Sequence, residues 1–480
     1  MASAIPARSS PPASRASRRG PWRTAPTPSR LRAWRSASSA GRIVPLLDKL
    51  RAIVGPAHVL AGVELSPFVI EGRTPEAAVL PGSVDEVAAV IVQAAEAGVP
   101  VVPWGGGSAI GVGVPAARAG LVLLLTRLDA LVEHEPGDLT ATAQAGITLA
   151  ALQAALRARG QWLSLDPPDV ARATLGGVLA ANASGPRRHL YGTARDVLIG
   201  VTVVTADGAV VRGGGKVVKN VAGYDLPKLF VGSFGTLGVI VEATVKLRPV
   251  PDEERLVATR FERLTDAGAA VRALLASDLI PNAVELLDAT STAALGLPPA
   301  TATLAVGFDG LGDQVDWQVA ELASLVAPCG GAKPVALPPP TWERLASAAR
   351  DAFGAPAAMM TLSVLPAVVA DTMEQGAEAS RQRGLASAWC AHAGVGHLTA
   401  TLRSEGARQD PASVAAVLED WRAAARAGGG HASVTWAPLP VKSALRVWDD
   451  AGAAGRLMQR IKAQLDPSNV LNPGRFVGGI

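Results

Sequence analysis

The sequence contains little cysteine, little charge and no long apolar run. Its 480 residues include two cysteines, Cys329 and Cys390, and no Cys-x-x-Cys motif. This excludes a disulfide scaffold, a four-cysteine zinc site and an iron–sulfur cluster bound by this chain. No uncharged apolar stretch reaches the roughly 18 residues that a membrane-spanning helix needs. We therefore expect a large soluble protein without a transmembrane segment, in a reducing, cytoplasmic compartment.

Charged residues make up 18% of the chain and apolar residues 49%, which excludes a disordered or fibrous protein. The net charge is +4, and residues 1–42 carry nine arginines without any Asp or Glu. The rest of the chain is slightly acidic, so we expect no nucleic-acid partner.

Residues 1–42 are rich in Arg, Ser, Pro and Ala and lack apolar periodicity. This composition fits a transit peptide, or an extension read from an upstream start codon. The chain has 37 arginines against eight lysines, as GC-rich bacterial genes often encode. We favour a disordered or misassigned bacterial N-terminus over a targeting signal.

From about residue 72 the chain alternates helices, strands and hairpins, which predicts an α+β fold. The pattern of Val84–Ala97 predicts an amphipathic helix with Ser83 as its N-cap and Gly98 at its end. A further helix is expected over 148–159. Strands are expected over 99–103, 121–125, 140–145, 197–205, 209–212, 239–247, 303–307 and 397–402.

Three loops rich in Gly, Ser and Thr suggest a binding site. They cover 104–113, then 174–177 with 182–186, and 232–238. Each alone is compatible with a tight turn, and only Gly111-x-Gly113-x-x-Ala116 fits a relaxed Rossmann pattern. Together they suggest backbone amides that approach a large ligand with more than one phosphate.

Other chemistry has little support in the sequence. No Gly-x-Ser-x-Gly elbow and no P-loop motif occurs. His392 and His397 are close in sequence, but a spacing of five does not place both on one face of a helix or strand. We favour separate structural or solvent-exposed roles for them and expect no metal site.

In their order and content, these loops resemble the FAD-binding domain of the vanillyl-alcohol-oxidase or p-cresol methylhydroxylase (PCMH) type. Residues 184–188 (SGPRR), 219–225 (KNVAGYD) and 472–476 (NPGRF) more closely resemble the E-type FAD-binding subunit of the bacterial glycolate oxidase (glycolate dehydrogenase) complex. The resemblance implies a two-subdomain FAD-binding domain over 72–252. A smaller α+β cap or substrate domain over 253–480 would follow, with a C-terminal tail that packs on the FAD domain.

The resemblance also implies FAD as cofactor. The first loop reads Gly-Gly-Gly-Ser and lacks the histidine of relatives with covalent flavin, so we expect non-covalent FAD. The implied FAD-binding residues are Pro103, Trp104, Gly105, Gly106, Gly107, Ser108, Ile110, Gly111, Thr174, Gly176, Gly177, Ser184, Gly238, Val239 and Ile240. Thr174, Gly176, Gly177 and Ser184 are expected on the flavin and ribityl side.

The implied activity is oxidation of glycolate or a related 2-hydroxy acid to the 2-oxo acid, with electrons passed to a partner. Arg187, Arg188 and Lys219 are the candidate cations for the substrate carboxylate; the alternative for each is a surface cation or a cofactor-phosphate contact. The metal-binding motif Gly-His-x-Gly-Asp-Gly-Asn-x-His of related catalytic subunits is degraded, with Val395 and Thr399 at its Asp and second His. The catalytic base therefore stays open.

The implied partners are a second flavoprotein subunit and an iron–sulfur subunit, which would bring the chain to the inner face of the membrane. Two alternatives remain for the function. The chain is either a non-catalytic subunit that holds FAD as a relay or an assembly element, or a stand-alone FAD-dependent alcohol or sugar oxidase.

Overall fold

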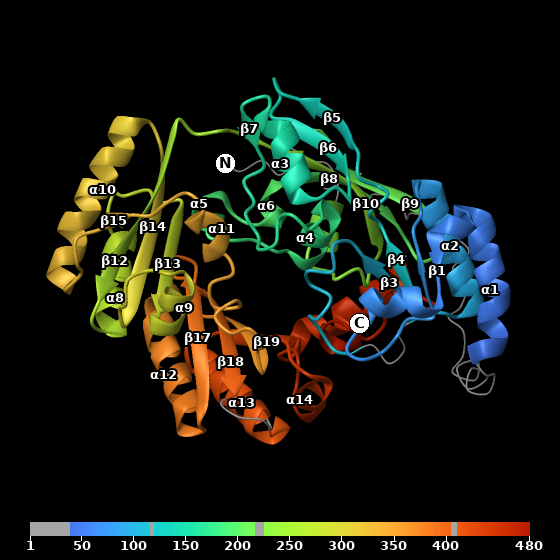
Figure 1. Ribbon diagram of the computed structural model, residues 1–480. Coiled ribbons are helices and arrows are strands. Elements are labelled where there is room, and N and C mark those ends of the chain that lie inside the picture. The colour runs from blue at the N-terminus through green and yellow to red at the C-terminus, as the bar shows by residue number, and fades with distance from the viewer. Residues whose placement is uncertain (1–38, 116–119, 217–224, 405–409) are drawn as a thin grey trace, which may run out of the picture.

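The computed structural model describes residues 39–115, 120–216, 225–404 and 410–480 (Figure 1). Its first half, up to residue 249, has a four-stranded sheet of order β1-β2-β4-β3 and a five-stranded sheet of order β5-β6-β10-β8-β9. A short pair, β7 and β11, lies beside them. The second half has an eight-stranded antiparallel sheet of order β15-β12-β14-β13-β17-β18-β16-β19.

The helices of the first half are α1 (Ser39–Val54), α2 (Val84–Ala97), α3 (Leu149–Arg157), α4 (Leu175–Ala181), α5 (Arg188–Tyr191), α6 (Ala194–Val197) and α7 (Leu226–Phe230). Its strands are β1 (Val59–Leu60), β2 (Ala77–Val79), β3 (Val101–Trp104), β4 (Leu121–Leu124), β5 (Leu131–Glu135), β6 (Thr140–Gln144), β7 (Gln161–Trp162), β8 (Leu198–Val204), β9 (Val210–Gly214), β10 (Val239–Lys246) and β11 (Arg248–Pro249).

The helices of the second half are α8 (Leu264–Leu275), α9 (Ala289–Ala294), α10 (Gly312–Val326), α11 (Thr341–Leu345), α12 (Val369–Gln382), α13 (Pro411–Ala427), α14 (Leu439–Ala444) and α15 (Gly455–Leu465). Its strands are β12 (Glu253–Phe261), β13 (Ala283–Asp288), β14 (Ala302–Gly310), β15 (Val335–Ala336), β16 (Ala358–Ser363), β17 (Leu385–His392), β18 (His397–Ser404) and β19 (His431–Trp436).

Helix α2 follows directly from its sequence. The Ser83 hydroxyl accepts a hydrogen bond from the Glu86 amide at 3.1 Å, and Gly98 ends the helix with a φ of 63°. The apolar face, including Val87 and Ile91, is fully buried on the four-stranded sheet. Helix α1 packs beside it, so the described fold begins at residue 39, well before residue 72.

The large sheet has two different faces. Helices α8, α10, α12 and α13 cover one face, on the side away from the first half of the chain (Figure 1). The other face carries α9 and α11 and turns toward the first half, where α5 packs against β13. Residues on this second face are therefore placed at the junction of the two halves.

The C-terminal tail returns to the first half. The Val101 amide donates to the Val470 carbonyl at 2.8 Å, and the Asn472 amide donates to the Val101 carbonyl at 2.8 Å. On α15, the buried Lys462 ammonium donates to Asp466 at 2.6 Å and to the Leu471 carbonyl at 2.8 Å. The tail is thus attached to the edge of β3, immediately before the first glycine-rich loop.

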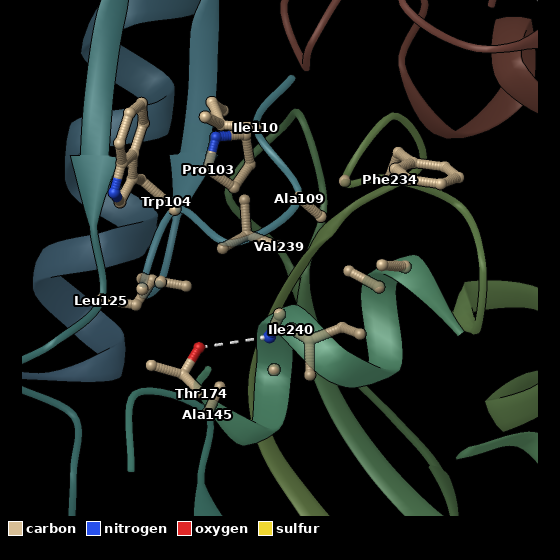
Figure 2. Close-up of a pocket in the computed structure, with 18 of the residues that line it drawn as sticks. Pro103, Trp104, Ala109, Ile110, Leu125, Ala145, Thr174, Phe234, Val239 and Ile240 are labelled. Carbon is tan, nitrogen blue, oxygen red and sulfur yellow. Dashed lines mark hydrogen bonds between the residues drawn. The ribbon is translucent and has the colours of Figure 1, made fainter. Parts of the chain in front are cut away.

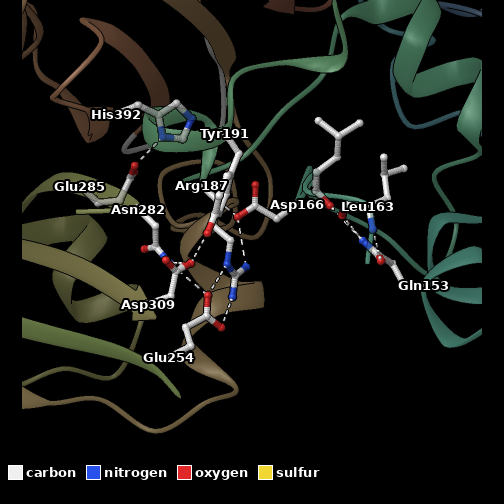
Figure 3. A network of polar contacts seen from close by, with 11 residues as sticks. Gln153, Leu163, Asp166, Arg187, Tyr191, Glu254, Asn282, Glu285, Asp309 and His392 are labelled. Atoms are coloured by element: carbon white, nitrogen blue, oxygen red, sulfur yellow. Dashed lines mark hydrogen bonds and ion pairs between the residues drawn. The ribbon is translucent and has the colours of Figure 1, made fainter. Parts of the chain in front are cut away.

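Arg187 joins the two halves (Figure 3). Its Nε and Nη2 donate to both carboxylate oxygens of Glu254 in β12, at 2.6 and 2.7 Å, and its Nη1 lies 3.3 Å from Asp166. The guanidinium carbon lies 3.9 Å from the ring centroid of Trp342 in the second half. Such a two-point pair, combined with stacking, fixes both distance and orientation.

We expect Arg187→Met to lower the free energy of unfolding by about 3 kcal/mol, because Asp166 and Glu254 would remain largely buried without their cation. Urea unfolding followed by tryptophan fluorescence measures the change. Arg381→Met is the matched control: this exposed arginine pairs with Glu378 on α12, and such surface pairs contribute at most about 1 kcal/mol. Equal losses in the two variants would contradict the assignment of Arg187 as an interdomain clamp.

Candidate functional site

An open cavity of about 750 Å³ lies between the two sheets of the first half and the C-terminal tail (Figure 2). Thr174 lies at one side of it, Trp104 and Ile110 at another, and Phe234 across from them. The lining residues are Pro103–Ile110, Leu125, Ala145, Thr174, Gly176, Gly177, Ala180, Ala181, Phe234, Gly235, Gly238, Val239, Ile240, Asn472 and Arg475.

The structure brings 13 of the 15 expected cofactor residues together around this cavity. Gly111 lines a neighbouring pocket that shares Gly107, Ser108 and Ile110 with it. Ser184 lies outside the lining, and its buried hydroxyl has no hydrogen-bond partner among the described residues. Three loops that are far apart in sequence therefore surround one space.

One of these segments is a helix start and not a loop. Thr174 is the N-cap of α4, and its hydroxyl accepts a hydrogen bond from the Gly177 amide at 3.3 Å. Gly176 lies in the first turn, where its amide donates to the Ala145 carbonyl at 2.8 Å. The sequence prediction of a loop at 174–177 is wrong because the Gly pair masks a capped helix.

The glycines of the first loop allow close packing within the protein. A Cβ on Gly106 would lie 1.8 Å from the Arg172 carbonyl oxygen, and one on Gly105 would lie 2.0 Å from the Thr174 hydroxyl. Among the described residues, no acceptor pairs with the amides of 105–109. These amides are therefore available to a ligand, as a phosphate-binding loop requires.

Two lining residues come from the C-terminal tail and were absent from the sequence-based site. The Asn472 side-chain amide donates to the Phe234 carbonyl at 2.7 Å, while its Oδ1 is buried without a partner in the described part of the chain. Arg475 is 2% exposed, and its Nη1 and Nη2 are likewise buried without a partner there. In the sequence, the motif at 472–476 indicated family membership but not a place in the cavity lining.

Five polar side chains, here called the polar row, cross the face of the large sheet that turns toward the first half of the chain. Glu285, His392, His397, Ser363 and His431 are register partners along five neighbouring strands, so their side chains share one face. His392 Nδ1 lies 2.7 Å from Glu285 Oε1 (Figure 3). The rings of His392 and His397 are stacked, with centroids 5.8 Å apart.

This arrangement corrects the expectation of separate roles for the two histidines. A spacing of five cannot place both side chains on one face of a single helix or strand. Here the intervening residues form a hairpin, so His392 ends β17 and His397 begins β18 directly opposite. Among the described residues, no group of three or more His, Cys, Asp or Glu side chains is arranged to hold a metal ion.

The polar row has an unusual electrostatic setting. Burial raises the pKa of Glu285. Burial, together with the charge of Arg188, holds the pKa of His397 well below its ordinary value, so this ring is neutral. Burial also lowers the pKa of the Arg188 guanidinium, and the Glu285 carboxylate opposes this effect. Perturbed groups of this kind are typical of functional sites.

The three candidate cations have different surroundings. The guanidinium of Arg187 forms ion pairs with Asp166 and Glu254, so this residue has a structural role and is not free to bind a substrate carboxylate. Arg188 is half-buried beside the polar row, and its guanidinium has no hydrogen-bond or ion-pair partner among the described residues. Lys219 lies outside the described residues.

Comparison with known proteins gives the class of the protein. Residues 75–214 match the FAD binding domain family, and residues 250–476 match the C-terminal domain of FAD linked oxidases. The chain belongs to the family of FAD-linked oxidases. It is an FAD-dependent oxidoreductase with an α+β fold of the PCMH type, as the sequence predicted.

The chain is similar to the glycolate oxidase subunit GlcD of Bacillus subtilis, with 30% identity over 84% of this chain and 89% of that protein. It is also similar to a probable mitochondrial D-lactate dehydrogenase of Danio rerio, with 28% identity over 92% and 94%. The fold resembles p-cresol methylhydroxylase with a TM-score of 0.75, 19% identity and coverage of 92% and 98%. The relation to glycolate oxidase is confirmed through GlcD; the correspondence with the E-type FAD-binding chain of that complex rests on the sequence motifs.

Two glycine variants distinguish a glycine that is needed for packing within the protein from one that leaves room for the ligand. Gly106→Ala places its methyl group against the Arg172 carbonyl, so we expect it to destabilise the FAD-free protein by about 1–3 kcal/mol. Gly177 lines the cavity, and a Cβ there would meet only the Thr174 hydroxyl, at 3.2 Å. Gly177→Ala should keep the stability of the FAD-free protein and weaken FAD binding by about tenfold. Thermal unfolding and FAD titration test both; a stable Gly106→Ala would contradict this account of the loop.

Proposed function

We propose that this protein oxidises glycolate or a related small 2-hydroxy acid to the 2-oxo acid, with non-covalent FAD in the cavity. The observation that carries the proposal is the polar row on the large sheet, faced by the Arg188 guanidinium, which has no partner among the described residues. When bound, FAD supplies a two-electron acceptor. Two relatives, a glycolate oxidase subunit and a probable D-lactate dehydrogenase, support a 2-hydroxy acid as substrate.

A short stretch of chain connects the cavity to the polar row. Helix α4 lines the cavity as far as Ala181, and Arg188 begins α5 seven residues later. The side of the cavity near Thr174 is where the flavin is expected by family resemblance. A substrate between α5 and the large sheet would therefore be near the reactive end of the cofactor.

Arg188 is proposed to bind the substrate carboxylate. A guanidinium can donate two parallel hydrogen bonds to a carboxylate. Its half-buried position strengthens such a pair relative to one in water. Arg188 also raises the electrostatic cost of protonating His397, which keeps that ring neutral next to the substrate.

His392 is proposed to accept the hydroxyl proton. Because Nδ1 faces Glu285 Oε1, Nε2 is the ring nitrogen left to receive it. Glu285 would orient the ring and stabilise the charge that forms on it, as carboxylates do for catalytic histidines. The buried Cys390 lies 3.6 Å from the other Glu285 oxygen, and burial raises the pKa of its thiol, so it stays protonated.

The electrons are proposed to leave through a hetero-oligomer that contains a second flavoprotein subunit and an iron–sulfur subunit. The name of the Bacillus subtilis relative marks that protein as a subunit. Within the described part of this chain, no helix is long and apolar enough to cross a membrane. The proposed location is cytoplasmic, at the inner face of the membrane through these partners.

A second candidate is a relay or assembly subunit that holds FAD without oxidising the acid. Thr399 favours it, because the metal-binding motif that the family resemblance implies has a histidine at this position. The purified chain, mixed anaerobically with glycolate or D-lactate, distinguishes the two functions. Bleaching of the flavin near about 450 nm supports oxidation by this chain; a flavin that stays oxidised, while a partner subunit restores turnover, supports the relay.

We expect Arg188→Gln to raise the KM for the acid by about 100-fold, because the carboxylate would lose a charged, two-point contact. Steady-state kinetics with an artificial acceptor measures this. Arg195→Gln, which changes an arginine on the nearby helix α6, should leave KM unchanged. A variant that loses kcat at constant KM would speak against carboxylate binding.

We expect His392→Gln to slow flavin reduction by about 100- to 10,000-fold, the range typical of lost general-base catalysis. Anaerobic stopped-flow absorbance measures the step directly, separate from transfer to the acceptor. Glu285→Gln should slow it less, because the imidazole would remain. Unaltered reduction in His392→Gln would remove this residue from the proton transfer.

A further inference from the structure

The described lining of the cavity contains one charged side chain, and this side chain has no partner. Arg475 is 2% exposed, and both of its terminal nitrogens are buried without an acceptor in the described part of the chain. Burying unpaired charged donors is costly in free energy. Such a residue is therefore explained best by an anion that the bound state supplies.

The position of Arg475 is fixed by its own backbone. Its carbonyl accepts hydrogen bonds from Trp448 Nε1 at 3.0 Å and from the Val114 amide at 2.9 Å. Its stem passes over Gly113, where a Cβ would lie 2.9 Å from Arg475 Cγ. Gly113 also has a φ of 99°, a conformation that favours glycine. The guanidinium is thus held beside the end of the first glycine-rich loop.

No described residue forms a hydrogen bond or an ion pair with the terminal nitrogens of Arg475. Glu71 is the one carboxylate among them whose charge opposes the effect of burial, which lowers the pKa of Arg475. One oxygen of that carboxylate, Oε1, is paired with the Lys442 ammonium, which also donates to the carbonyls of Gly111 and Gly113 at 2.7 and 3.0 Å. The other oxygen, Oε2, is buried and forms no hydrogen bond to Arg475 or to any other described residue. The donors of Arg475 are consequently left for a ligand.

We propose that Arg475 binds the diphosphate of FAD. The diphosphate is the one anionic part of this cofactor, and Arg475 is the one cation among the described cavity-lining residues. The free amides of 105–109 would provide the neutral donors around it, and the guanidinium would provide the charge. This inference rests on FAD as cofactor and is independent of the proposed substrate.

The test compares FAD with ADP, which carries the same diphosphate without the flavin. In Arg475→Met, we expect the affinities of the FAD-free protein for both ligands to fall by the same factor, about 10- to 100-fold. Flavin fluorescence measures FAD binding, and competition with FAD measures ADP binding. Arg475→Lys should restore part of the loss, because it keeps the charge but not the two-point geometry.

Two controls separate ligand binding from folding. Arg446→Met removes an exposed arginine from the same region and should leave both affinities unchanged. The FAD-free Arg475→Met protein should unfold at a temperature no lower than the wild type, because it loses an unpaired buried charge.

Weaker FAD binding with unchanged ADP binding would place Arg475 at the flavin ring and overturn the proposal. A destabilised FAD-free protein would make Arg475 a packing residue, which also overturns it. Failure of the acid to reduce the flavin would refute the proposed function alone.

Discussion

The close backbone contact between the first glycine-rich loop and the segment before α4 determines the shape of the cavity in the first half of the chain. At Gly106 the loop is so near the Arg172 carbonyl that no side chain fits, and at Gly105 the Thr174 hydroxyl occupies the place of a Cβ. This contact holds the loop after β3 against the start of α4. The amides of the loop consequently face a space that is formed before any ligand enters, which reduces the entropy lost on binding.

The cavity and the polar row differ in charge. The described lining of the cavity is neutral apart from Arg475, which suits a large cofactor with one anionic group. The row on the large sheet instead combines a buried carboxylate with stacked imidazoles, and Arg188 faces them from the other half of the chain. The site thus depends on how the two halves are docked. The pair between Arg187 and Glu254 fixes that docking one residue away from Arg188.

Much of the fold could be predicted from the sequence because local signals were strong. The cap at Ser83 and the left-handed Gly98 define α2, and alternating apolar residues define strands such as β10. Thirteen of the residues that line the cavity were also predicted, since each glycine-rich segment is visible locally. Helix α1 was not predicted, because its sequence follows an arginine-rich stretch without apolar periodicity.

The polar row was beyond sequence reasoning for a different reason. Glu285 and His392 are 107 residues apart, and their contact depends on the pairing of β13 with β17. A shift of one residue in that register would turn the Glu285 side chain to the opposite, helix-covered face. Local patterns do not determine register between distant strands, whereas packing of the whole sheet does. The same argument applies to Arg475, whose role depends on where the tail returns and not on the motif around it. The glycine-rich segments are visible in local sequence, whereas the contact of Glu285 with His392 and the place of Arg475 in the cavity lining are visible only in three dimensions.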